Sequence, residues 1–183
     1  MTRLPPNTFA TFCKGLDQPT LSDVFTRAGL PAAAEGTSSG WAWLTHQGVT
    51  GGDVLRLARD LTGYRYVDLA GGPDRVETVF LASTPACACP HGQNYLVPHC
   101  PEHPFQVSHS RGGFEQLYLN MGGRRESRRG GGRSDHLLPE LLAAGIVGRD
   151  TARYDADPDF NADGAHTRRI VAEHFGLPAE LRP

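Results

Sequence analysis

The chain has 183 residues, of which 39% are hydrophobic, and it contains 22 glycines and 14 prolines. This length suffices for one hydrophobic core, and the glycine and proline content is typical of short elements joined by many turns rather than of a long-helix bundle. The 18 basic and 20 acidic residues give a net charge of −2, which excludes a globally basic protein. Any nucleic-acid contact must therefore come from a local patch.

No apolar stretch approaches the roughly 20 residues that a membrane-spanning helix needs, and the first residues lack the apolar core of a secretory signal. We therefore expect a cytoplasmic protein without a membrane partner. Stable disulfides are uncommon in that compartment, so clustered cysteines there indicate metal binding or redox chemistry.

Residues 1–70 are predicted to form a mainly helical N-terminal part. Apolar residues recur at helical spacing over residues 20–29 and, most clearly, over residues 50–63, and a glycine ends each segment. Between the two helices, residues 41–44 are a short apolar strand candidate, and residues 64–69 alternate as a strand does.

Residues 71–123 are predicted to be β-rich. The segment 76–82 (VETVFLA) is expected to be a strand because β-branched and aromatic residues dominate it. Two further strands are expected at 105–109 and 114–121, and the turn residues between them predict a hairpin.

Residues 124–133 are predicted to form an Arg/Gly loop, and residues 134–183 a helical C-terminal part with helices over 137–144 and 167–175. The expected fold class is α+β in one compact domain. It would have a small antiparallel sheet with a zinc-stapled hairpin, flanked by N-terminal and C-terminal helices.

Three of the four cysteines and three of the eight histidines fall between residues 87 and 103. The spacing is C-x-C, then ten residues, then C-x2-H. Pairs of ligands joined by a short hairpin are typical of structural zinc. The predicted zinc ligands are Cys87, Cys89, Cys100 and His103.

The identity of the fourth zinc ligand stays open. His91 and His99 lie in the same segment and could replace His103 or form hydrogen bonds to the ligands. Four protein ligands close the zinc shell, which favours a structural site over a catalytic one, since catalytic zinc keeps a position for water. A disulfide and a segment without metal are the alternatives.

The densest positive charge of the chain is the run GGRRESRRGGGR, in which five arginines are offset by one glutamate. Arginine presents a planar donor fork to phosphate, and glycines let the backbone follow a nucleic-acid strand. A solvated linker is the competing interpretation. The predicted nucleic-acid-binding residues are Arg111, Arg124, Arg125, Arg128, Arg129 and Arg133.

Aromatic residues next to this run could stack on bases. Phe114 and Tyr118 lie on the adjoining strand, where we expect them in the core or on the hairpin face. The remaining cysteine, Cys13, is expected to be a small core residue.

Asp135 and His136, together with Asn161 and either His166 or His174, could be interpreted as a histidine–asparagine–histidine nuclease motif. The Asp-His pair precedes a predicted helix instead of ending a strand, and the later spacings are poor. His136 is therefore expected to be a surface residue at the start of a helix.

The sequence thus predicts a zinc-containing nucleic-acid-binding or nucleoprotein-assembly factor without catalysis. One alternative is a metal-dependent nuclease or hydrolase that uses His91 or His99 beside the zinc. The other is a zinc-stabilised adaptor whose arginines bind an acidic protein partner. The sequence leaves open whether the protein is an enzyme and favours a non-catalytic role.

Overall fold

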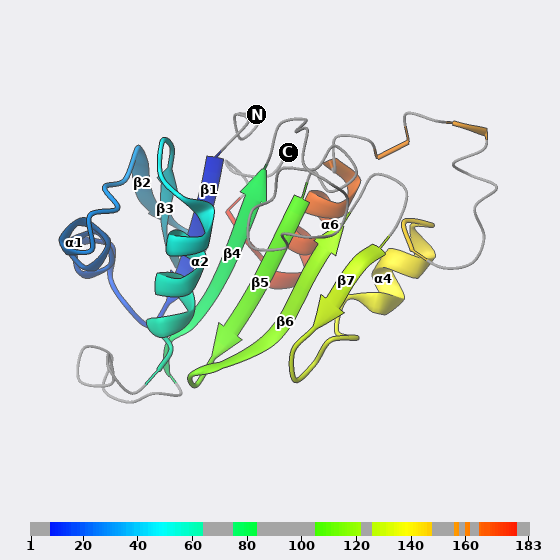
Figure 1. The fold of residues 1–183 in the computed structure, drawn as a ribbon. Coiled ribbons are helices and arrows are strands. Elements are labelled where there is room, and N and C mark those ends of the chain that lie inside the picture. The colour runs from blue at the N-terminus through cyan, green and yellow to red at the C-terminus, as the bar shows by residue number, and fades with distance from the viewer. Residues whose placement is uncertain are drawn as a thin grey trace.

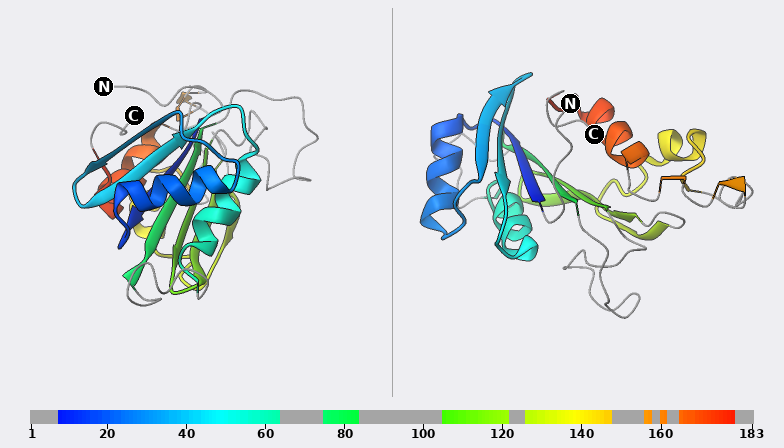
Figure 2. Two further views of the ribbon diagram at one scale, coloured as in Figure 1. Left: turned by 90° about the vertical axis from the view of Figure 1, so that its left-hand side faces the viewer. Right: turned by 90° about the horizontal axis from the view of Figure 1, so that it is seen from above.

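The computed structural model describes residues 8–63, 75–83, 105–121, 126–147, 156–157, 160–161 and 165–178. These residues form three layers, in which a seven-stranded sheet lies between helices on both of its faces (Figures 1 and 2). In chain order the elements are β1 (Thr8–Lys14), α1 (Gln18–Arg27), β2 (Ala34–Ser38), β3 (Trp41–His46), α2 (Gly51–Asp60), β4 (Glu77–Ser83), β5 (Phe105–Arg111), β6 (Phe114–Met121), β7 (Glu126–Gly130), α4 (Leu138–Ala143) and α6 (Ala165–Phe175).

The sheet has the strand order β2-β3-β1-β4-β5-β6-β7, and each strand is antiparallel to its neighbours. From β4 to β7 the chain runs as a simple meander. The N-terminal half is more complex, because β1 lies between β3 and β4, which are therefore parallel to each other. Helix α2 connects these two strands across one face of the sheet.

Helix α1 begins where the sequence offers capping chemistry. The Asp17 carboxylate accepts a hydrogen bond of 2.9 Å from the Thr20 backbone N–H. Hydrogen bonds from the side chain and from the backbone of Thr20 lower the pKa of Asp17. The helix ends at Gly29, whose φ of 75° lets the Leu30 N–H reach the Phe25 carbonyl oxygen. The predicted helix is confirmed, with Asp17 as its N-cap.

Helix α2 packs closely on the sheet at both of its ends. A side chain at Gly51 would place its Cβ 2.5 Å from the Phe9 ring, so only glycine fits at this point of contact. At the other end the buried Thr78 hydroxyl donates a 2.8 Å hydrogen bond to the Ala58 carbonyl oxygen. These two contacts direct the apolar face of α2 at the sheet.

The two faces of the sheet carry separate hydrophobic clusters, because side chains alternate along each strand. On the face covered by α1 and α2, strand residues pack against the buried side chains of both helices. The strand members of this cluster are Phe9, Cys13, Ala42, Leu44, Phe80, Ala82 and Tyr118.

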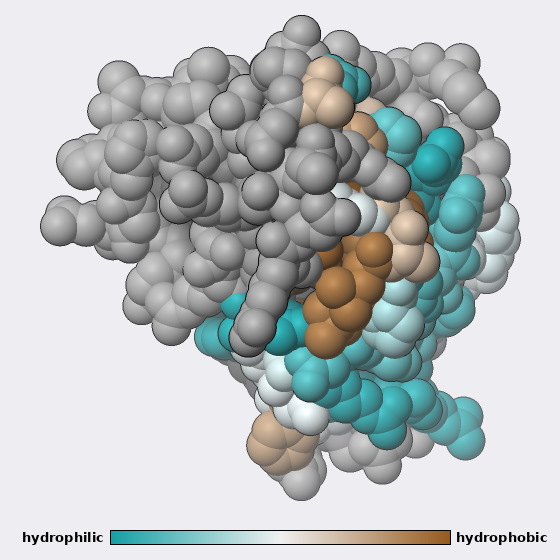
Figure 3. All heavy atoms as spheres, turned by 90° about the vertical axis from the view of Figure 1, so that its right-hand side faces the viewer, coloured by the Kyte–Doolittle hydropathy of each residue, from teal (hydrophilic) through white to brown (hydrophobic). Residues whose placement is uncertain are grey.

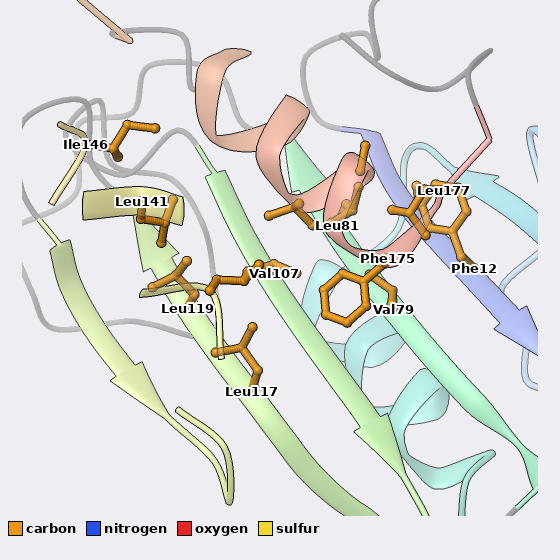
Figure 4. Packing of buried hydrophobic residues seen from close by; sticks show 14 of the residues in the cluster. Phe12, Val79, Leu81, Val107, Leu117, Leu119, Leu141, Ile146, Phe175 and Leu177 are labelled. Atoms are coloured by element: carbon orange, nitrogen blue, oxygen red, sulfur yellow. The ribbon is translucent and has the colours of Figure 1, made fainter. Parts of the chain in front are cut away.

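The opposite face packs against α4, α6 and the residues that follow them (Figure 4). Phe175 and Leu177 lie over β1 and β4, whereas Leu141 and Ile146 lie near β6. The strand members of this cluster are Ala10, Phe12, Trp41, Val79, Leu81, Val107, Leu117 and Leu119. The C-terminal helices thus complete the core of the same sheet that the N-terminal helices cover.

The predicted α+β class and the hairpin over β5 and β6 are confirmed, but the expected sheet was too small. Residues 8–63 alternate strands with helices instead of being mainly helical. Residues 126–130, within the expected Arg/Gly loop, form the edge strand β7. The zinc-stapled hairpin and the strand expected over 64–69 fall outside the described residues. No helix in the described part of the chain is long and apolar enough to cross a bilayer.

A histidine is buried in the core beneath α1. The His46 ring stacks on Phe25 at a centroid distance of 4.9 Å, and its Nδ1–H donates to the Pro31 carbonyl oxygen at 3.2 Å. Its Nε2 is buried without a hydrogen-bond partner. Burial lowers the pKa of His46, so the folded protein holds this ring in its neutral form.

We expect the free energy of unfolding to fall as the pH is lowered from about 7.5 to about 5.5. Below the ordinary histidine pKa, the unfolded chain takes up a proton at His46 and the folded chain does not. Chemical denaturation at both pH values measures the effect. The variant His46→Phe should lose less stability on acidification than the wild type, and the matched variant His166→Phe, changed at an exposed position, should behave as the wild type. Equal pH dependence in all three proteins would contradict this role of His46.

Candidate functional site

Several of the sequence-predicted site residues fall on segments that the structure does not describe. They are Cys87, Cys89, His91, His99, Cys100, His103, Arg124 and Arg125. Within the described ranges, no group of three His, Cys, Asp or Glu side chains could hold a metal ion. The zinc site therefore stays a prediction. Cys13 is a buried core residue as expected, and burial raises the pKa of its thiol to about 12.

The remaining predicted arginines lie at one end and one edge of the sheet. Arg128 and Arg129 belong to β7, the edge strand, where they pair in register with Asn120 and Leu119. The Arg129 guanidinium forms an ion pair of 3.1 Å with the Asp135 carboxylate. Since this pair neutralises part of the positive charge, Arg129 is a weaker candidate for phosphate contact than the sequence suggests.

Arg133 is held beside the beginning of β6. The backbone N–H groups of Gly132 and Arg133 donate to the carbonyl oxygens of Glu115 and Gln116, at 3.0 and 2.6 Å. Gly131 makes this close approach possible, because its φ is 98° and a Cβ there would lie 2.5 Å from the Gln116 carbonyl oxygen. The exposed Arg133 thus lies next to the turn that joins β5 and β6.

The turn between β5 and β6 is fixed to the end of α2. The Gly113 N–H donates to the Thr62 hydroxyl at 3.2 Å, and Gly112 and Gly113 both have positive φ. Arg111 and Phe114 flank the turn as a register pair, and both are exposed. We call Arg111, Phe114 and Arg133 the hairpin surface.

The two aromatic residues of β6 have different environments. Tyr118 is buried, and its hydroxyl accepts a 2.8 Å hydrogen bond from the Gln106 side-chain amide, as befits a core residue. Phe114 is 70% exposed. Exposure of that extent leaves the Phe114 ring available to a ligand. Sequence alone does not tell which of the two aromatic residues is exposed.

Charged side chains continue from the hairpin surface across the end of the sheet. Lys14, Glu77 and Arg111 are register neighbours on β1, β4 and β5. A hydrogen bond from His109 lowers the pKa of Glu77, and the charges of Lys14 and Arg111 act in the same direction. Lys14 Nζ also lies 4.1 Å from the centroid of the Trp41 ring.

Three histidines gather on the face of the sheet covered by α4 and α6, and we call His109, His136 and His174 the histidine cluster. His109 Nε2 lies 3.0 Å from a carboxylate oxygen of Glu77, and His174 Nδ1 lies 2.9 Å from one of Glu140. The His136 and His174 ring centroids are 4.6 Å apart. Carboxylates that orient imidazoles in this way are common at functional histidines.

The sequence did not predict this cluster. His136 and His174 were considered only with Asn161 as a nuclease motif, and the structure gives Asn161 another role. Its side-chain oxygen accepts from the N–H groups of His166 and Thr167, which caps the start of α6. Only the packing of α4 and α6 on β5 brings the three imidazoles together.

The side of the molecule formed by β7 and α4 is apolar in part. Viewed from the side of β7 and α4, a group of hydrophobic atoms is bordered by hydrophilic residues (Figure 3). Leu142 on α4 is 48% exposed and, after Phe114, is the other large hydrophobic side chain exposed in the described part of the chain.

The comparison with protein-family models finds no match, and no curated protein and no solved structure is found to be similar to the chain. The site must therefore be interpreted from its own chemistry.

Replacing Gly131 by alanine should destabilise the protein by about 2 kcal/mol or more, because the left-handed backbone costs about 1–2 kcal/mol and the new Cβ would clash with the Gln116 carbonyl oxygen. Gly29→Ala is the matched control, since Gly29 also has positive φ but has open space around it. Urea denaturation compares the two variants. Equal losses of stability would show that the chain after β7 does not need the close approach at Gly131.

Proposed function

We propose that the protein binds nucleic acid through the hairpin surface, acting as a binding or nucleoprotein-assembly factor without catalysis. The observation that carries the proposal is the exposed Phe114 ring. Arg111 lies across the β5–β6 turn from Phe114, and Arg133 lies on the segment after β7 that is hydrogen-bonded to the beginning of β6. In the described part of the chain, neither guanidinium takes part in a hydrogen bond or an ion pair. Both are therefore available to phosphate groups.

An exposed aromatic ring near arginines suits a single strand better than a duplex. Every base has a π-face, and stacking on an aromatic side chain contributes about 1–3 kcal/mol per base without sequence preference. The bases of a duplex are stacked on one another and do not offer that face. Arginine contacts to phosphate fix the strand beside the ring. This division of roles predicts sequence-tolerant binding that weakens with salt.

Zinc enters the proposal as a structural element of the connection between β4 and β5, which joins these strands at the end opposite the hairpin surface. Residues 84–104 leave β4 at Ser83 and return at Phe105, and these two residues are register partners in neighbouring strands. The ends of a long connection are thus fixed side by side, and connections of this length usually need structure of their own. A zinc ion bound by Cys87, Cys89, Cys100 and His103 would supply that structure locally.

Metal analysis of the purified protein tests the zinc proposal. We expect about one equivalent of zinc, because one closed shell of four ligands binds one ion. Cys100→Ser should lose the metal. Cys13→Ala is the matched control, since Cys13 is a buried core residue outside the predicted zinc-binding segment, and it should keep the zinc. A wild-type protein purified without metal and unable to bind added zinc would refute the proposal.

Binding of a fluorescent single-stranded oligonucleotide, measured by anisotropy over a salt series, tests the function. The logarithm of the affinity should fall with the logarithm of the salt concentration with a slope of about −3 to −3.5, as expected for four or five contacts to a single strand, made by Arg111 and Arg133 together with the predicted Arg124, Arg125 and Arg128. The double change Arg111→Ala and Arg133→Ala should make the slope shallower by about 1.4, and Phe114→Ala should weaken binding about tenfold with little change in slope.

Two exposed residues outside the hairpin surface serve as matched controls for this experiment. Arg27 on α1 is largely exposed in an ion pair with Asp23, and Leu142 is the exposed apolar residue of α4. Arg27→Ala and Leu142→Ala should leave both affinity and slope unchanged. A salt-independent affinity, or equal losses in the controls and in the hairpin variants, would reject the hairpin surface as a nucleic-acid interface.

A further inference from the structure

The histidine cluster borders the hairpin surface. The His136 backbone N–H donates to the Arg133 carbonyl oxygen at 3.0 Å, so the two residues stand at the ends of one turn of the chain. The charge of Arg133 acts on His136. A strand that binds at Arg133 therefore passes close to the imidazoles of His136 and His174.

The carboxylate of Glu140 leaves one nitrogen of His174 available. Glu140 accepts the hydrogen of Nδ1 at 2.9 Å, so Nε2 is the nitrogen that can donate to a ligand when the ring is protonated. The neighbouring ring of His136 is exposed and meets His174 edge-on. Two imidazoles and one guanidinium thus offer donors on the same side of α4 and α6.

The net charge of this region depends on its histidines. Arg129 and Asp135 form an ion pair, and the second arginine, Arg133, is balanced in formal charge by Glu140. With neutral imidazoles the group carries no net charge. A proton that binds to His136, which is exposed, adds one positive charge to this surface.

His109 is the buried member of the histidine cluster. His109 is hydrogen-bonded to Glu77, its ring contacts Phe175 at a centroid distance of 4.8 Å, and its Nδ1 is buried without a partner. Burial lowers the pKa of His136, and the charges of His174, His109 and Arg133 lower it further against the opposing effect of Glu140. Without a ligand, His136 therefore resists protonation.

We propose that Arg133, His136 and His174 form a phosphate-binding subsite that takes up a proton when it binds a phosphate group. This inference rests on the proposed function, because the phosphate would be that of the bound nucleic-acid strand. Free phosphate has the same chemistry and is the other source that the experiment distinguishes. Of these three residues, the sequence predicts only Arg133 as a nucleic-acid-binding residue.

The direction of the pH dependence follows from the charges. A bound phosphate adds negative charge beside His136, so it raises the pKa of His136 in the complex. Affinity is then higher below that pKa and falls as the pH rises through it. If the pKa rises by about one unit, the affinity should increase about fivefold between about pH 7.5 and about pH 5.5.

The test follows the imidazole resonances of the full-length protein by NMR during pH titrations at constant ionic strength. The titrations are run in chloride, with inorganic phosphate, and with a single-stranded oligonucleotide. Oligonucleotide affinity is measured in parallel at both ends of the pH range. His136→Asn removes the exposed titrating group, and His166→Asn, at an exposed position near the start of α6, is the matched control.

We expect the oligonucleotide to raise the pKa of His136, and His136→Asn to lose most of the roughly fivefold pH dependence while His166→Asn keeps it. Oligonucleotide binding without a shift of His136 would overturn the subsite and leave the proposed function intact. A shift with inorganic phosphate alone, with no oligonucleotide binding, would support the subsite and overturn the nucleic-acid function. No shift with either ligand would overturn the subsite.

Discussion

The rest of the structure depends on the burial of β1 on both of its faces. This strand pairs with β3 on one side and β4 on the other, and its side chains alternate between the two hydrophobic clusters. Phe9 and Cys13 require cover from α1 and α2, whereas Ala10 and Phe12 require cover from the C-terminal segment. A strand with two apolar faces can be stable only in a three-layer arrangement, because either exposed face would leave large apolar side chains in water.

The candidate sites lie where this layering ends. Strand ends place Lys14, Glu77 and Arg111 in one row at the border of the apolar clusters. The backbone there is held by few but specific contacts, namely the hydrogen bonds of Gly113 to Thr62 and of Arg133 to Gln116. Side chains on a rigid sheet end keep their positions without being buried. That combination is what a surface for an extended, charged ligand needs.

Sequence patterns predicted elements well where local signals were strong. The helices at α1, α2 and α6 and the β5–β6 hairpin follow from apolar spacing, capping residues and glycines. The strand β1 was missed because TFATFCK is apolar on both faces and lacks the alternation of a half-buried strand. Strand β7 was missed because its residues ESRRG have low strand propensity, and only pairing with β6 makes them extended.

By itself, the sequence determined the α+β class, the hairpin between β5 and β6 and the concentration of arginine next to it, because these depend on residues close together in the chain. It also defined the cysteine and histidine spacing that predicts zinc. Only the tertiary structure decided which aromatic residue is exposed, since Phe114 and Tyr118 differ in burial and not in sequence character. It also decided the histidine cluster, because His109 on β5, His136 in the turn before α4 and His174 on α6 meet only when α4 and α6 pack on the sheet.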